Sequence, residues 1–254
     1  MSWDPAQYLR YADQRLRPAL DLLARIDLDA PDAIADLGCG AGNVTVHLKR
    51  RWPLARITGV DNSPQMLERA RMLDADIGWD LAELSGWKPP RALSLLYSNA
   101  ALHWADGHAE LFPRLAGQVA TGGVLAVQMP HQNGAPSHRA AFELAKSARW
   151  RARFAWPMRE TPVADPQQYY DWLRPHVSGL DIWETEYLQQ MDGENPVAEW
   201  TKGTFLLPFL GALGEKDGAR FEAEYRSLVL EAYPKRADGS TLFPFRRLFV
   251  IARR

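Results

Sequence analysis

The stretch from residue 34 to residue 45, IADLGCGAGNVT, constrains the fold of this chain more than any other segment. Three glycines stand between an apolar run that ends at Leu37 and a helical pattern that begins near Asn43. Glycine adopts positive φ freely and lets a ligand approach the main chain without meeting a Cβ. A strand, a glycine turn and a helix in this order direct backbone N–H groups at a ligand. The stretch therefore predicts an α/β sheet with a ligand site at the carboxyl end of its first strand.

Apolar runs and helical patterns alternate along most of the chain. This alternation indicates a mostly parallel sheet with helices on both faces. The expected strands are 33–37, 56–60, 77–79, 93–98, 124–129, 182–190 and 245–252, and the expected helices are 43–51, 63–71, 109–119, 137–154 and 166–173. Roughly 50 mostly helical residues separate the last two strands, too many for a hairpin turn. We interpret them as a helical lid over 196–240. We expect a helical cap over 1–30 and a single main domain over 31–254.

Composition narrows the classes of function. The formal net charge is −1, so no overall positive field attracts nucleic acid or an anionic membrane. Cys39 is the only cysteine, which excludes an internal disulfide and fits a reducing compartment. We see no secretory signal pattern, no apolar run long enough to span a membrane and no metal-ligand spacing. The sequence therefore predicts a cytoplasmic protein without a bound metal.

The spacing of the glycines and two acidic residues distinguish between ligands. A dinucleotide fingerprint, G-x-G-x-x-G, would need a glycine where this chain has Asn43, and the chain shows G-x-G-x-G instead. Asp36 stands two residues before the first glycine, where it opposes a pyrophosphate but suits an ammonium and a sulfonium group. Asp61 ends the second expected strand, where carboxylates bind ribose hydroxyls.

Together, DLGCGAG and GVD resemble the motifs of class I S-adenosylmethionine-dependent methyltransferases. The resemblance implies a Rossmann-like fold with a mostly parallel seven-stranded sheet, and S-adenosyl-L-methionine as the cofactor. A glycine-rich turn of another α/β protein is the alternative, and the presence of both motifs at this spacing argues against it.

The resemblance also implies which residues bind the cofactor. An acidic residue after the third strand accepts from the adenine amino group, and Glu83 is the candidate, with Asp80 as its competitor. Residues after the fourth strand lie beneath the methionine moiety or shape the pocket, although Trp104 is equally suited to the core. The expected cofactor-binding residues are Asp36, Gly38, Gly40, Gly42, Asn43, Asp61, Asn62, Met66, Glu83, Leu84, Asn99, Ala100 and Trp104.

The two ends of the chain, WDPAQYLRYADQRLRPALDLLARI and FPFRRLFVIARR, resemble those of the trans-aconitate 2-methyltransferase family. That family esterifies one carboxylate of a small tricarboxylate. A carboxylate is already deprotonated at neutral pH, so we expect positioning and no general base. A polyanionic substrate needs a few arginines, whose forked donors match carboxylates. The expected substrate-binding residues are Tyr8, Arg15, Arg17, His103 and Arg247.

One departure leaves the acceptor open. Where the family often reads TGLRP, this chain reads TFLLP, so Leu207 replaces an arginine and Phe205 replaces a glycine. Lys202 is a possible substitute charge. A smaller acid, an amine, or cofactor binding without catalysis remain alternatives. A nucleic-acid substrate is disfavoured because the stretch from Asn99 to Leu102 lacks the D/N-P-P-Y/F motif. We expect a monomer or a weak homodimer.

Overall fold

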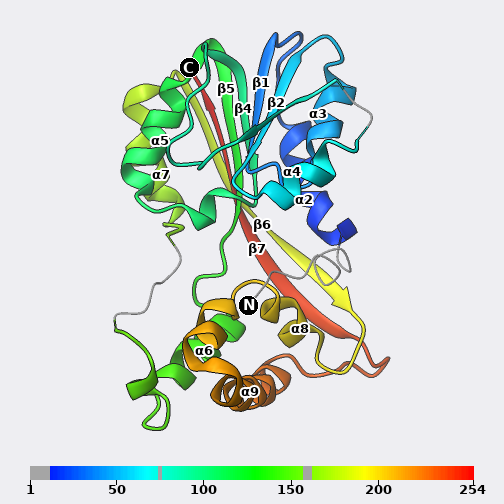
Figure 1. Cartoon of the computed structure of the whole chain (residues 1–254), viewed down its shortest axis with the longest axis vertical. Coiled ribbons are helices and arrows are strands. Elements are labelled where there is room, and N and C mark those ends of the chain that lie inside the picture. Colours follow the sequence, from blue (N-terminus) through cyan, green and yellow to red (C-terminus); the bar gives the residue numbers. More distant parts are fainter. Residues whose placement is uncertain (1–11, 74–75, 157–161) are drawn as a thin grey trace. The chain divides into compact units, whose positions relative to one another are not determined.

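The structure, a computed structural model, describes residues 12–73, 76–156 and 162–254. A seven-stranded sheet has the order β3-β2-β1-β4-β5-β7-β6 (Figure 1). Strands β1 to β5 are parallel to one another, and β7 is antiparallel to β5. The mostly parallel seven-stranded sheet is thereby confirmed. The strands are β1 Ala33–Leu37, β2 Arg56–Asp61, β3 Gly78–Leu81, β4 Leu93–Asn99, β5 Val119–Pro130, β6 Gly179–Met191 and β7 Thr241–Arg253.

Helices cover both faces of the parallel part of the sheet. Figure 1 shows α5 and α7 on one side of it and α2, α3 and α4 on the other. All five residues of β1 are buried, as expected of a central parallel strand covered on both faces. The α-helices are α2 Ala12–Ala24, α3 Thr45–Arg51, α4 Pro64–Ala70, α5 His108–Gly117, α6 Pro136–Lys146, α7 Pro166–Leu173, α8 Pro196–Lys202 and α9 Leu207–Ala232.

The chain divides into two compact units. Of the described residues, the first unit, here called the sheet unit, contains 15–73, 76–131, 162–185 and 247–254, and the second, the helical unit, contains 12–14, 132–156 and 186–246. Each has its own apolar core. The expected helical segment 196–240 therefore belongs to a larger body that also includes α6 and the adjoining parts of β6 and β7.

Two local features of the helices differ from the simplest sequence pattern. Pro18, which suits the opening of a second helix, lies inside α2, where it removes one backbone hydrogen bond without ending the helix. Gly214 interrupts α9 with φ 70° and ψ 179°, so that this element consists of two helical pieces. Both features leave the expected helical regions in place.

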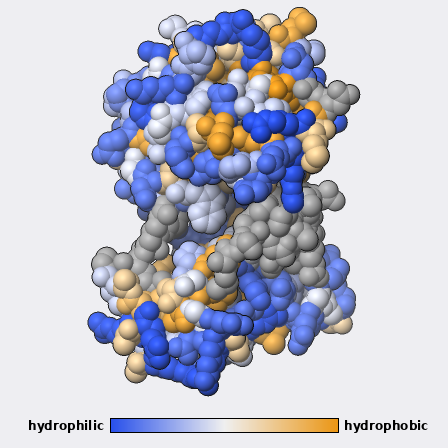
Figure 2. Space-filling view, in the orientation of Figure 1, coloured by the Kyte–Doolittle hydropathy of each residue, from blue (hydrophilic) through white to orange (hydrophobic). Residues whose placement is uncertain are grey.

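The face of the molecule drawn in Figure 2 is predominantly polar where it is coloured. Figure 2 shows hydrophilic residues over most of the face in view, with apolar residues in small groups between them. Within the part of the chain that the structure describes, no helix combines the length and apolar character needed to cross a membrane.

Candidate active site

The glycine loop after β1 contains three residues with positive φ. Gly38, Gly40 and Gly42 have φ values of 81°, 55° and 79°. A Cβ on Gly38 would lie 2.1 Å from the Cβ of Ala101, and one on Gly42 would lie 2.7 Å from the Trp79 ring. By contrast, a Cβ on Gly40 would meet nothing within 4 Å. Packing therefore explains the first and third glycines, whereas the second leaves its side of the main chain open to a ligand.

Two alanine substitutions should separate these roles. Gly38→Ala should lower the stability of the protein by several kcal/mol, because it combines positive φ with a severe overlap. Gly40→Ala should cost only about 1 kcal/mol of stability, because its strain is confined to the backbone. It should nevertheless weaken cofactor binding by about tenfold or more, because the methyl group occupies the open side of the loop. Denaturant unfolding and calorimetry measure the two effects, and equal cofactor affinity in Gly40→Ala and wild type would contradict the assignment.

The Asp61 carboxylate holds the glycine loop from the end of β2. Its Oδ2 accepts from the Gly40 N–H at 2.8 Å, and its Oδ1 accepts from the Ser63 N–H at 2.9 Å. A carboxylate oxygen accepts about two hydrogen bonds, so each oxygen retains capacity for a sugar hydroxyl. These two contacts fix the orientation of the carboxylate before any ligand arrives.

The register of the adenine contact can be followed at the end of β3. Asp80 lies within β3, and its Oδ2 accepts from the Trp87 indole N–H at 3.3 Å. Glu83 lies beyond the carboxyl end of the strand, and its Oε1 accepts from the Asn62 amide at 3.2 Å. Asn62 itself follows Asp61, and on this geometry we propose Glu83 rather than Asp80 as the adenine contact. Leu84 is half-buried, and its Cδ1 lies close to Gly38.

Asp36 lies beneath the glycine loop. Its side chain is buried, and its Oδ2 accepts from the Thr45 hydroxyl at 2.6 Å, which connects β1 to the first residue of α3. Burial raises the pKa of Asp36 to about 7, the Thr45 hydrogen bond opposes that shift, and the nearby Asp61 charge adds to it. Burial likewise raises the pKa of the Cys39 thiol, so this thiol stays protonated and is a poor nucleophile.

The ionisation of Asp36 predicts a pH-dependent stability. The pKa is raised to about 7 in the native state from an ordinary value of 3.8, so the native protein holds a proton that the unfolded chain releases. The stabilisation of the native state by this retained proton is fully present below pH 3.8 and is lost as the pH rises through about 7. Asp36→Asn should therefore gain about 2 to 3 kcal/mol relative to wild type between pH 5 and pH 8. Urea unfolding at both pH values provides the test, and a constant difference between the two proteins would contradict it.

The residues after β4 adopt a strained conformation. Ala100 is the one non-glycine residue with positive φ, 52°, in the described part of the chain, and its N–H donates to the Gln128 carbonyl on β5 at 2.9 Å. The Asn99 Oδ1 atom is buried and has no hydrogen-bond partner among the described residues. Backbone strain beside an unsatisfied polar atom is typical of a ligand site.

Other expected cofactor contacts lie around the same edge of the sheet unit. Trp104 has an exposed fraction of 52%, so the alternative that it belongs to the core is wrong. Its ring lies 4.8 Å from that of His103, between centroids, on the short helix Leu102–Trp104 that follows β4. Met66 is half-buried on α4, and Asn43 is exposed at the end of the glycine loop.

The expected substrate residues differ in their placement. Arg247 is buried on β7, and its Nη1 donates to the Gln128 Oε1 at 3.3 Å. Arg17 lies on α2 with a 75% exposed side chain, 4.0 Å from Asp21, so it occupies a solvent-facing position. Arg15 lies in α2, but its side chain is outside the described part of the structure, as is the whole of Tyr8. Of this set, Arg247 and His103 lie in the described part of the sheet unit near the strand ends.

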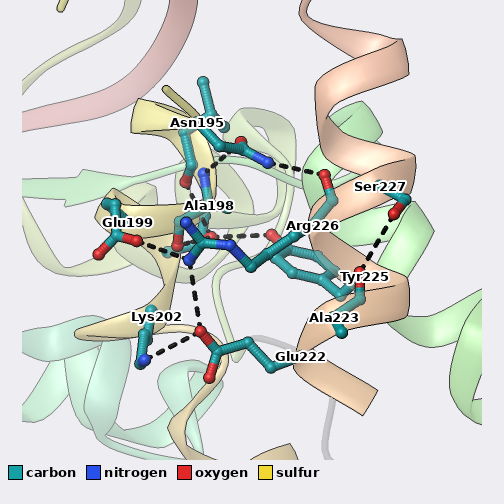
Figure 3. A network of polar contacts seen from close by, with 11 residues as sticks. Asn195, Ala198, Glu199, Lys202, Glu222, Ala223, Tyr225, Arg226 and Ser227 are labelled. Atoms are coloured by element: carbon teal, nitrogen blue, oxygen red, sulfur yellow. Dashed lines mark hydrogen bonds and ion pairs between the residues drawn. The ribbon is translucent and has the colours of Figure 1, made fainter. Parts of the chain in front are cut away.

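The departures at Leu207 and Phe205 lie in the helical unit. Phe205 packs in an aromatic cluster, with its ring centroid 3.8 Å from His138 and 5.4 Å from Phe209. Lys202 pairs with Glu222 at 2.9 Å, and Glu222 also contacts Arg226 (Figure 3). The Lys202 charge is thus compensated within this network, which weakens the interpretation that it replaces the missing arginine.

Two residues that shape the site are not apparent from the sequence. Gln128 stands within the run VLAVQMP, and the available signal is a single amide in an otherwise apolar run. Trp79 stands in a weakly patterned segment, yet its ring occupies the space that Gly42 and Gly59 leave. No local pattern links a tryptophan to glycines so distant in the sequence.

Comparisons with known proteins agree with this geometry. A family model described as "Methyltransferase domain" matches residues 34–123. The solved structure of the YcgJ protein from Bacillus subtilis superposes with a TM-score of 0.59 at 12% identity, over 94% of this chain and 99% of that one. A Haemonchus contortus phosphoethanolamine N-methyltransferase, solved with S-adenosylhomocysteine, has a TM-score of 0.55 at 14% identity, over 93% of this chain and 52% of that one. These likenesses confirm the Rossmann-like fold.

The fold and the glycine–aspartate site define a class I S-adenosylmethionine-dependent methyltransferase. The trans-aconitate 2-methyltransferase of Streptomyces coelicolor is 49% identical over 100% of this chain and 87% of its own length. The protein of the same name from Azoarcus is 44% identical over 99% of this chain and 98% of its own. The chain belongs to the trans-aconitate 2-methyltransferase family.

The described residues fit the cofactor. The open side of Gly40 permits close approach to the main chain, and Asp61 retains acceptor capacity for ribose hydroxyls. The unsatisfied Asn99 Oδ1 is an acceptor suited to an ammonium group. We propose that Asn62, Met66, Glu83, Leu84 and Trp104 surround the rest of the molecule.

Proposed function

We propose that this enzyme transfers a methyl group from S-adenosylmethionine to one carboxylate of trans-aconitate and forms a methyl ester. The observation that carries the proposal is the 49% identity, over the whole of this chain, to a trans-aconitate 2-methyltransferase. The buried guanidinium of Arg247, which lies on β7 opposite Pro130 at the end of β5, supports it, because a buried cation suits a polycarboxylate.

When bound, S-adenosylmethionine supplies a methyl group on a sulfonium, and an O–C bond to the acceptor replaces its S–C bond. The protein's residues bring the acceptor carboxylate into line and exclude water from it. No residue needs to remove a proton, because carboxylates are ionised at neutral pH. Positioning of this kind supplies about 7 to 11 kcal/mol in favourable cases.

The placement of individual residues supports a proposed role for each. Asp61 binds the ribose hydroxyls of the cofactor, and the main chain at Gly40 lies against the cofactor. The Asn99 Oδ1 accepts from the ammonium group of the cofactor. Arg247 binds a carboxylate that does not react. We further propose that Arg15, on α2, and Tyr8 contribute to the acceptor site. We propose that Arg17 contributes only its positive charge, from a solvent-facing position.

The substrate class, the localisation and the oligomeric state are proposed from composition and sequence motifs. The net charge of −1 and the Asn99 to Leu102 segment favour a small carboxylate over a nucleic acid. The single cysteine favours a reducing cytoplasm. A monomer or a weak homodimer remains our expectation.

The experiment that tests the proposed function has two stages. Calorimetry with S-adenosylhomocysteine measures cofactor binding, and a mass-spectrometric screen of di- and tricarboxylates then measures ester formation. We expect trans-aconitate to give the highest kcat/KM. Because Phe205 and Leu207 depart from the family pattern, a smaller acid is the second candidate. Cofactor binding without methylation of any carboxylate in the screen would overturn the proposal.

A further inference from the structure

Three polar side chains form a row across neighbouring strands of the sheet unit. In the register of the sheet, Asn99 on β4 pairs with Gln128 on β5, and Gln128 pairs with Phe249 on β7. Arg247 stands two residues before Phe249 and so points to the same face. Asn99, Gln128 and Arg247 therefore lie together on one face, where β4 and β5 end. We call these three residues the polar row.

Helix α2 covers the same face of the sheet. Tyr97 stands two residues before Asn99, so its side chain shares this face, and its hydroxyl donates to the Ala19 carbonyl of α2 at 2.8 Å. Tyr97 is fully buried, which closes the face on the amino side of the row. The polar row thus begins where the apolar packing beneath α2 ends.

The orientation of the Gln128 amide is fixed by Arg247. A guanidinium only donates hydrogen bonds, so the amide oxygen faces it, and the Oε1–Nη1 distance is 3.3 Å. The Nε2 group is then left as a donor. Gln128 is 0% exposed, and its Nε2 has no hydrogen-bond partner among the described residues. A buried amide donor without a partner is unfavourable unless a ligand accepts from it.

The unsatisfied atoms of Asn99 and Gln128 have opposite polarity. Asn99 Oδ1 is an acceptor and suits a cationic group, whereas Gln128 Nε2 is a donor beside a buried guanidinium and suits an anion. The Ala100 N–H bond to the Gln128 carbonyl connects the two halves of the row through the backbone. The row therefore offers adjoining places for an ammonium group and a carboxylate.

We propose that Gln128 binds a non-reacting carboxylate of the acceptor through its Nε2 donor and orients Arg247 toward the same carboxylate. This inference rests on the proposed function, because it assigns a specificity-determining residue for that acceptor. The neutral amide is important in this position. An acidic residue would neutralise Arg247 and repel the substrate, whereas an apolar residue would leave the guanidinium without its partner in the row.

Two variants of Gln128 test the proposal in the full-length protein. Gln128→Leu removes the donor, and we expect the KM for trans-aconitate to rise by about ten- to a hundredfold. Gln128→Glu keeps the shape but adds a negative charge, and we expect a rise at least as large. For both variants, the Kd of S-adenosylhomocysteine should stay within about threefold of wild type. Gln128→Glu keeps the test decisive should the leucine variant fail to fold.

Gln118→Leu is the matched control. Gln118 directly precedes the first residue of β5, at the opposite end of the strand from Gln128, and its Nε2 donates to the Trp87 carbonyl at 3.1 Å. This variant should lose stability in thermal unfolding but keep the wild-type KM. An unchanged KM in both Gln128 variants, with active wild-type enzyme, would overturn the inference alone. Wild-type protein that binds S-adenosylhomocysteine but methylates no polycarboxylate would instead overturn the proposed function.

Discussion

Asp61→Ala should weaken the binding of S-adenosylhomocysteine by about a hundredfold or more. The carboxylate is expected to accept two charge-assisted hydrogen bonds from the ribose, each contributing about 1.5 to 3 kcal/mol. A combined loss of at least about 3 kcal/mol corresponds to two orders of magnitude in Kd. The substitution also frees the Gly40 and Ser63 N–H groups that Asp61 now holds, so the glycine loop loses its support. Isothermal titration calorimetry at fixed pH and salt measures the change.

Two further variants make the Asp61 result interpretable. Asp61→Asn keeps one acceptor oxygen without the charge, so its affinity should lie between those of wild type and Asp61→Ala. Asp76→Ala removes a carboxylate that is 99% exposed and pairs only with Lys49 among the described residues, at 3.2 Å. Surface pairs contribute little, so this variant should bind the cofactor like wild type. Equal affinity in Asp61→Ala and Asp76→Ala would remove Asp61 from the site.

The glycine loop and the acidic residue at the end of β2 were predictable because their requirements are local in the sequence. The positive φ at Gly40 favours glycine, and a ribose contact at the end of β2 favours an acidic residue. Both requirements therefore appear as motifs in the sequence. The alternation of apolar runs and helical patterns likewise indicated the parallel sheet. What the sequence alone did not provide was the reason for each glycine. That reason depends on Ala101 and Trp79, which reach the loop only through the fold.

Other features depend on tertiary contacts and escaped sequence analysis. The third strand is only four residues long, so its register is weakly marked in the sequence. The proposal of Glu83 rather than Asp80 as the adenine contact depends on the Trp87 and Asn62 contacts. Gln128 is hidden in an apolar strand, and only strand pairing brings it beside Arg247. The helical unit was anticipated as a segment, but its extent depends on α6 packing with α9, far away in sequence.

Arg247→Met should raise the KM for the acceptor by about a hundredfold or more, with little change in cofactor affinity. Arg247 is 3% exposed, so its charge is poorly screened by water and acts strongly on a carboxylate beside it. A bidentate pair with a carboxylate involves two charge-assisted hydrogen bonds, each about 1.5 to 3 kcal/mol. Methionine retains the length and apolar stem of arginine, so the packing on β7 changes least. Steady-state kinetics with trans-aconitate and calorimetry with S-adenosylhomocysteine separate the two effects.

The neighbouring residue supplies the control for Arg247. Arg246→Met removes the same charge from an exposed side chain on the same strand, and it should leave the acceptor KM within about twofold of wild type. Arg247→Lys tests geometry against charge, because lysine keeps the positive charge but lacks the forked donors. We expect it to recover part of the loss in Arg247→Met. If Arg247→Met weakened cofactor and acceptor binding equally and also lowered the melting temperature by many degrees, Arg247 would stabilise the sheet and would not bind the acceptor.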